Sequence, residues 1–243
     1  MTNIGEEALS KAAEIGLSSQ LDEAEELNVD VEANPGELVQ GKVDSVEIEG
    51  EGLVMEKDLR TEELELKTDA IAINPLKAAF GEIELQQPTK ASAYVVLKEQ
   101  DIERAFNSEY IQNKLQNLKV TVNDKPITLK INSIKFHLPG NNKVSLMANV
   151  LLVEPEETKE IAFSAICAIA ANGYSVSLKE IEFAKGKEAS PELTEALLES
   201  TKELLDLRNF ELEGMSLRLT HLDMQKGKLT LQAQAQVEEF PNG

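Results

Sequence analysis

The feature that most constrains the fold is a long succession of alternating apolar and polar residues between positions 118 and 239. Such alternation places apolar side chains on one face of a β-strand, so it predicts antiparallel strands that each bury one face. The clearest turn is Asn172-Gly173, which joins expected strands at 158–171 and 174–183. The chain is therefore expected to be rich in antiparallel sheet.

Other strands follow from the same pattern. They are expected at residues 27–32, 43–48, 53–59, 64–73, 92–97, 118–122, 127–136, 143–153, 210–223 and 228–238. Asn34-Pro35-Gly36, Asn123-Asp124-Lys125-Pro126 and Pro139-Gly140-Asn141-Asn142 predict turns between them, and Gly50-Glu51-Gly52 is also interpreted as a turn.

Helices are expected at only a few places. Residues 3–19 predict a helix because Ile4, Ala8, Ala12 and Ile15 lie on one of its faces. In residues 99–117 the apolar stripe changes face near Asn107-Ser108, which predicts a kink or two short helices. Residues 75–80 predict a helical turn, and Ser190-Pro191 is a favourable helix start.

These helices are too few to cover both faces of so much sheet. The expected fold is therefore α+β, with a long, strongly curved antiparallel sheet wrapped around one or two helices and with an N-terminal helix. Residues 1–243 are expected to form a single elongated domain, in which residues 1–26 provide the N-terminal helix and an acidic connector. Residues 101–153 and 192–238 resemble each other weakly and suggest an internal repeat.

The charge of the chain excludes one class of partner. The sequence has 44 acidic and 24 basic residues, and residues 1–69 alone carry 20 acidic and 5 basic ones. Nucleic acids are bound mainly through cationic neutralisation of phosphates, and single strands also through aromatic stacking. With a net charge of −20 and no tryptophan, no nucleic-acid partner is expected.

Reactive side chains are sparse and do not form a catalytic pattern. His137 and His221 have no second histidine or cysteine at a metal-ligand spacing, so no metal and no cofactor are expected. Ser216 and Asp223 lie near His221, but no Gly-x-Ser-x-Gly elbow accompanies them. Cys167 lies in an apolar strand, which favours an inert thiol. The chain is therefore not expected to be an enzyme.

The sequence also bears on location. The first ten residues lack a basic region followed by an apolar stretch, which is the pattern of a signal peptide. The longest uncharged apolar run, residues 161–171, is too short to cross a bilayer as a helix. A cytoplasmic location is expected, with any membrane contact peripheral and transient.

An apolar interior is the remaining place for a function. Residues 158–171 are apolar on both faces of the expected strand, so they could pack on a second layer or line a cavity. Ordinary core stays open as the alternative reading of every candidate lining residue. The candidates are Phe106, Ile111, Leu115, Phe163, Ile166, Leu197 and Leu204.

One region resembles a known family. The segments that carry the resemblance are residues 41–53 (GKVDSVEIEGEGL), 58–60 (DLR), 73–81 (INPLKAAFG), 87–91 (QPTKA) and 101–111 (DIERAFNSEYI). Together they resemble the LmeA-like phospholipid-binding family, in particular its photosynthetic-bacterial branch, over roughly residues 5–155. The resemblance implies a fold of the tubular lipid-binding (TULIP) type, in which an acyl chain occupies the gap between a curved sheet and a helix. It implies no catalytic residue.

Two functions follow as hypotheses. The first is non-enzymatic binding or transfer of a phospholipid or acyl chain through an apolar groove between helix and curved sheet. The second is a structural or scaffold role, in which the acidic N-terminal third binds a protein partner. Co-purification of lipid distinguishes them.

Overall fold

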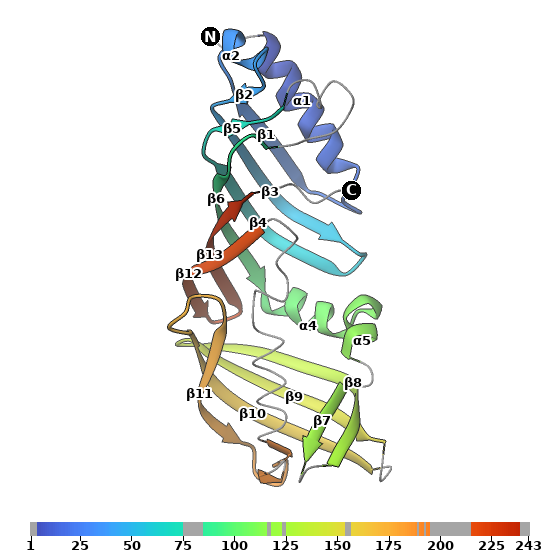
Figure 1. The fold of residues 1–243 in the computed structure, drawn as a ribbon. Helices are drawn as coiled ribbons and strands as arrows, with labels where there is room; N and C mark the ends of the chain where they lie inside the picture. Colours follow the sequence, from blue (N-terminus) through green and yellow to red (C-terminus); the bar gives the residue numbers. More distant parts are fainter. Residues whose placement is uncertain are drawn as a thin grey trace.

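The structure of the protein is a computed structural model, and most of the chain folds into antiparallel strands (Figure 1). It describes residues 4–74, 85–115, 118–122, 125–153, 157–188, 190–191, 193–194 and 215–238. The strands curl strongly, and the few helices include one at the N-terminus. The predicted α+β class and curved antiparallel sheet are thus confirmed.

The larger sheet combines the two ends of the chain. Its six strands lie in the order β1 (Glu26–Glu32), β3 (Ser45–Met55), β4 (Leu59–Thr68), β6 (Thr89–Lys98), β13 (Lys228–Val237) and β12 (Met215–Gln225), and all neighbours are antiparallel. The C-terminal hairpin therefore completes a sheet that the N-terminal strands begin.

The second sheet is built from consecutive strands. Its five strands lie in the order β11 (Val176–Phe183), β10 (Glu157–Ile169), β9 (Lys143–Leu152), β8 (Lys125–Gly140) and β7 (Leu118–Val122). A small third sheet pairs β2 (Lys42–Val43) with β5 (Ile71–Ala72). The strands predicted on either side of the turns after residues 122, 136 and 171 pair as antiparallel neighbours. Residues 123–124 lie outside the described part, and β8 continues through Pro139 and Gly140, so the second turn is formed by Asn141 and Asn142.

Two helices lie between the main sheets (Figure 1). They are α4 (Glu99–Asn107) and α5 (Glu109–Leu115), and the chain is extended at Ser108 between them (φ −67°, ψ 152°). The break falls where the apolar stripe changes face, so the predicted pair of short helices is confirmed. The other helices are α1 (Ile4–Ser18) and the short α2 (Pro35–Leu38).

Two expectations about the N-terminal third are corrected. Gly50 and Gly52 lie inside β3, and the turn comes later, at residues 56–58. Glu56 and Lys57 both adopt left-handed backbone conformations there, which the sequence does not announce. In α1, the stripe through Ala8, Ala12 and Ile15 is exposed, and Ile15 is 61% exposed. The half-buried side of this helix carries other residues, including Leu9 and Leu17.

Both long helices place polar side chains on the backbone amides of a strand edge. Ser10 Oγ and Glu6 Oε1 of α1 accept hydrogen bonds from the amides of Val31 (2.9 Å) and Ala33 (3.4 Å). α4 does the same along β8, beyond the part of that strand that pairs with β7. Unpaired edge amides are thereby satisfied within the chain.

The two main sheets meet at the turn between β8 and β9. Asn142 sits there in a left-handed conformation (φ 55°), and its Oδ1 accepts a hydrogen bond from the Met224 amide of β12 at 2.8 Å. The Cys167 amide of β10 donates to the Asn142 carbonyl at 2.8 Å. Buried apolar residues from both sheets surround this junction: Leu138, Val144, Ala165, Cys167, Met224 and Leu229.

Some expectations fall on the chain outside the described residues. They are the helical turn at 75–80 and most of the helix after Ser190-Pro191, although the Leu193 amide does donate to Ser190 Oγ at 3.2 Å, as a helix start requires. The weak internal repeat stays a prediction.

Candidate functional site

One face of the six-stranded sheet is apolar across its whole width. Directly opposed residues in an antiparallel sheet point to the same side, so the strand register identifies the residues of each face. Two such rows run from β1 to β12: Val29, Ile48, Leu66, Ala93, Ala233 and Leu219, and next to it Leu27, Gly50, Leu64, Val95, Leu231 and Leu222. These two rows define what we call the apolar face.

The opposite face of the same sheet is polar and, on its N-terminal strands, acidic. Its rows are Asp30, Glu47, Lys67, Ser92, Gln234 and Arg218, and Asn28, Glu49, Glu65, Tyr94, Gln232 and His221. Much of the negative charge of residues 1–69 thus lies on the side that faces away from the apolar rows. The apolar face itself is free of ionisable side chains in these two rows.

The centre of the apolar face is lined by small side chains. On β6 and β13, Ala93 opposes Ala233 and Ala91 opposes Ala235. Larger residues flank them on both sides, such as Leu66 on β4. All four alanines are half-buried. The centre of the apolar face is therefore lined by smaller side chains than its flanks.

Charged residues replace the apolar ones where this face approaches α4. In β4, Glu62 and Arg60 lie on the same side as Leu64, and Glu23 and Glu25 precede β1 at the same end of the sheet. A pocket of about 550 Å³ lies here. It is lined by Glu23, Ala24, Glu25, Gly52, Val54, Lys57, Arg60, Lys98, Gln100, Asp101 and Arg104. We call it the charged pocket.

Arg60 forms ion pairs with three carboxylates in and beside the charged pocket. Its guanidinium contacts the carboxylates of Glu25 (2.7 Å), Glu62 (2.5 Å) and Asp101 (3.0 Å). These hydrogen bonds raise the pKa of Arg60 above its ordinary value, and the bond that Arg60 donates to Glu62 contributes most. Glu62 also pairs with Lys98. The hydrogen bond from Lys98 lowers the pKa of Glu62 most, and the hydrogen bond from Arg60 lowers it further. Asp101 is 4% exposed, so Arg60 supplies the partner that a buried carboxylate needs.

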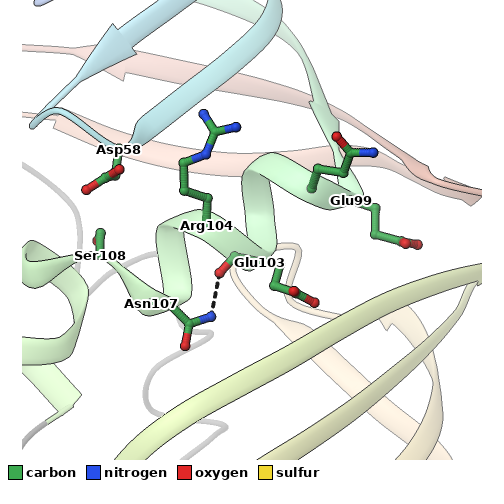
Figure 2. A pocket seen from close by; sticks show the side chains of 7 residues that line it. Asp58, Glu99, Glu103, Arg104, Asn107 and Ser108 are labelled. Atoms are coloured by element: carbon green, nitrogen blue, oxygen red, sulfur yellow. Dashed lines mark hydrogen bonds between the residues drawn. The ribbon is translucent and has the colours of Figure 1, made fainter.

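Arg104 is held much less tightly than Arg60. Its Nη2 lies 3.6 Å from Asp101 Oδ1, beyond hydrogen-bonding distance, and its side chain is 52% exposed. Figure 2 shows Arg104 extending from α4 toward the hairpin that carries Asp58. A second pocket of about 410 Å³ runs along α4, and Arg104 and Gln100 line both pockets. Its other lining residues are Asp58, Glu99, Glu103, Asn107 and Ser108.

The opposite side of α4 fastens the helix to β8. Glu99 Oε2 accepts from the Leu138 amide at 2.6 Å, and Glu103 Oε2 from the Phe136 amide at 2.9 Å. Asn107 bonds both backbone groups of Ile134 (2.7 and 3.0 Å) and also the Glu103 carbonyl (2.7 Å), the last drawn in Figure 2. The side chains of Glu99, Glu103 and Asn107 therefore attach α4 to β8.

Glu99 also contacts His137, whose Nδ1 lies 2.8 Å from Glu99 Oε2. Burial by itself raises the pKa of Glu99, but the hydrogen bonds from the Leu138 amide and from His137 outweigh it and leave that pKa below its ordinary value. Burial raises the pKa of the Cys167 thiol to about 11.

The structure distributes the seven predicted lining residues over several places. Phe106 and Ile111 pack against the buried cluster between α4, α5 and the five-stranded sheet, and Phe163 packs at the junction of the two sheets. Ile166 is half-buried in β10. The side chain of Leu115, and both Leu197 and Leu204, lie outside the described part. A lipid contact for these seven stays a prediction.

Sequence reasoning missed the apolar face as a candidate site. The pattern that could have revealed it is an alternation in which consecutive same-face positions hold alanine: Ala91 and Ala93 in one strand, and Ala233 and Ala235 in another. Each strand was recognised individually. The pairing of β6 with β13, which brings these alanines together, joins segments about 140 positions apart and is not visible in the sequence.

No group of metal-binding side chains occurs among the described residues. Within the same part of the chain, no helix has the length and apolar character needed to cross a bilayer.

Comparison with known protein families identifies the family of this chain. The model of a family described as LmeA-like phospholipid-binding matches residues 2–234. No curated protein and no solved structure matches the chain.

Proposed function

Because the chain belongs to the LmeA-like phospholipid-binding family, we propose that it binds a phospholipid without transforming it, with the acyl chains on the apolar face of the six-stranded sheet. Transfer of that lipid between membranes, through transient peripheral contact, is part of the proposal. The family description names binding and no reaction.

The observation that carries the proposal is the half-buried state of the apolar face. Leu27, Ile48, Leu66 and Val95 are each half-buried, whereas Val29 and Leu219 in the two edge strands are buried. On the five-stranded sheet, by contrast, the side turned toward α4 and α5 holds fully buried residues, including Leu129 (0% exposed), Val150 (3%) and Ile161 (4%). The six-stranded sheet thus offers apolar surface to a ligand where the other sheet has a filled core.

The gain in free energy is sufficient for a lipid. Burial of one methylene group contributes roughly 0.8 kcal/mol, so about ten methylenes contribute about 8 kcal/mol before the costs of association and ordering. An affinity in the micromolar range corresponds to about 8 kcal/mol. Binding of both chains of a phospholipid would leave a margin for those costs.

Lipid extraction tests the proposal directly. The protein is purified without detergent and extracted with organic solvent, and the extract is analysed by mass spectrometry. Stoichiometric phospholipid is expected. If the protein carries none and also takes up none from vesicles, the scaffold hypothesis, with a protein partner at the acidic N-terminal third, replaces the lipid hypothesis.

A pair of adjacent substitutions tests the location. Ala93→Leu adds a bulky side chain at the centre of the apolar face, and it should reduce lipid uptake by on the order of tenfold because the added methyl groups occupy the space of part of an acyl chain. Ser92→Leu introduces the same side chain at the next position of β6, on the polar face, and should leave uptake unchanged. Equal uptake by the two variants would contradict the assignment of the apolar face.

A further inference from the structure

We infer that the charged pocket beside α4 receives the headgroup of the bound lipid, and that Arg104 binds its phosphate. This inference rests on the proposed function, because it assumes that the acyl chains lie on the apolar face. It adds a headgroup site and a preferred headgroup class.

The first argument is continuity. The pocket and the apolar face meet along β4, where Glu62 and Arg60 continue the alternation of Leu66 and Leu64 on one side of the sheet. A molecule lying along the strands would therefore pass from apolar side chains to charged ones within about two residues, or about 7 Å. This sequence of environments matches an amphiphile whose tails lie on the apolar face and whose headgroup lies beside α4.

The second argument is charge. The lining of the pocket has four cationic residues, Lys57, Arg60, Lys98 and Arg104, against three acidic ones, Glu23, Glu25 and Asp101, although the whole chain carries −20. Glu62, which pairs with Arg60 and Lys98, brings the local charge to zero. A phosphate is thus repelled less here than on the acidic face of the sheet. A balanced pocket suits a zwitterionic headgroup, with an ammonium group near the carboxylates and a phosphate near the cations.

The third argument identifies the phosphate ligand. Arg60 and Lys98 are already bonded to carboxylates at the base of the pocket. Arg104 is half-exposed, and in the part of the chain that is described its ion pair is with Asp101 at 3.6 Å. A guanidinium at this distance can turn to a phosphate without breaking a hydrogen bond, and it binds phosphate oxygens in a bidentate manner. Lys57 lines the same pocket and is exposed.

The test separates the headgroup from the tails. Purified protein is incubated with vesicles of dioleoyl phosphatidylethanolamine and dioleoyl phosphatidylglycerol that contain a minor fraction of dioleoylglycerol. The dioleoylglycerol has the same chains but no phosphate. The protein is then re-isolated, and the bound lipids are quantified by mass spectrometry relative to their share of the vesicles.

Wild-type protein should take up phosphatidylethanolamine in preference to dioleoylglycerol and to phosphatidylglycerol. Arg104→Gln should lower the ratio of bound phosphatidylethanolamine to bound dioleoylglycerol by on the order of tenfold, the effect expected for loss of a charge-assisted hydrogen bond. Arg104→Lys should retain part of the preference for phosphatidylethanolamine, because lysine keeps the positive charge. Lys90→Gln removes one positive charge from the polar face of β6 and should leave the ratio unchanged.

The possible results are distinguishable. An unchanged ratio in Arg104→Gln, or a loss of both lipids in the same proportion, overturns the headgroup site, and preferential uptake of phosphatidylglycerol overturns the zwitterionic class. Ala93→Leu should reduce both lipids with the ratio preserved. If wild-type protein binds none of the three lipids, the proposed function itself fails and the headgroup site fails with it.

Discussion

The attachment of α4 to β8 through Asn107 leads to a quantitative prediction about stability. The side chain of Asn107 bonds the amide and the carbonyl of Ile134, a residue that is 5% exposed. Asn107→Ala removes both bonds. A hydrogen bond contributes about 0.5–1.5 kcal/mol net, and a buried group left without a partner costs about 1–3 kcal/mol. Because Asn107 itself is exposed, water can reach part of the site, and the expected loss is about 2–3 kcal/mol.

Asn113→Ala is the matched control. Asn113 is an exposed residue of α5, and replacement by alanine at such a position slightly favours a helix. The control should therefore be as stable as wild type or slightly more stable. Asn107→Asp keeps the oxygen that accepts from the Ile134 amide and loses the donor to the Ile134 carbonyl. The stability of Asn107→Asp should therefore lie between that of Asn107→Ala and that of Asn113→Ala.

Urea denaturation followed by far-ultraviolet circular dichroism measures the effect, since the chain has no tryptophan to report by fluorescence. A loss of this size lowers the melting temperature by roughly 5–10 °C for a chain of about this length. Hydrogen exchange should also show a faster-exchanging Ile134 amide in Asn107→Ala. If Asn107→Ala and Asn113→Ala unfold at the same urea concentration, the side-chain bonds to β8 do not stabilise the fold.

Two further predictions concern titratable groups. Glu62 and Glu99 have pKa values below the ordinary 4.5 in the folded protein, so the unfolded chain binds their protons more readily. Their contribution to stability is thus complete above pH 4.5 and is lost as the pH falls below it, and Glu99→Gln should make the loss of stability between pH 5 and 3 less steep; parallel curves for the two proteins would refute this. Cys167, with a pKa of about 11 and 5% exposure, should react with a thiol reagent at pH 8 only after unfolding, whereas rapid reaction in the native state would show that the thiol is accessible.

The sequence predicted local structure well wherever one strand or helix determines its own pattern. The break at Ser108 is visible because the apolar stripe shifts from one helix face to another, and the turn at Asn142 because asparagine tolerates a left-handed backbone. The turn after Met55 was predicted at the wrong place. Glu56 and Lys57 have no preference for the left-handed conformation that they adopt, whereas the glycines at 50 and 52 are typical of a turn. Gly52 has a different role, since a Cβ there would lie 2.5 Å from the side chain of Glu25.

The candidate site could not be predicted in the same way. The apolar face has its full width only because the C-terminal hairpin pairs with β6, and the charged pocket forms only because α4 packs against β4. Arg60 and Asp101 are 41 positions apart, and either residue alone resembles many other charged residues in this acidic sequence. Such sites depend on the pairing of segments far apart in the sequence, which local periodicity does not predict.

The bonds between α4 and β8 have a consequence for how long such a helix can be. Four helical residues advance about 6.0 Å, whereas two strand residues advance about 6.6–6.8 Å. The advance along the helix is therefore shorter than the advance along the strand by about 0.6–0.8 Å from each contact to the next. The accumulated difference reaches about 2 Å at a fourth contact. α4 makes three such contacts, through Glu99, Glu103 and Asn107, and ends after nine residues. A longer helix would drift out of step with the amides it covers, so the interruption at Ser108 comes where the two spacings cease to agree.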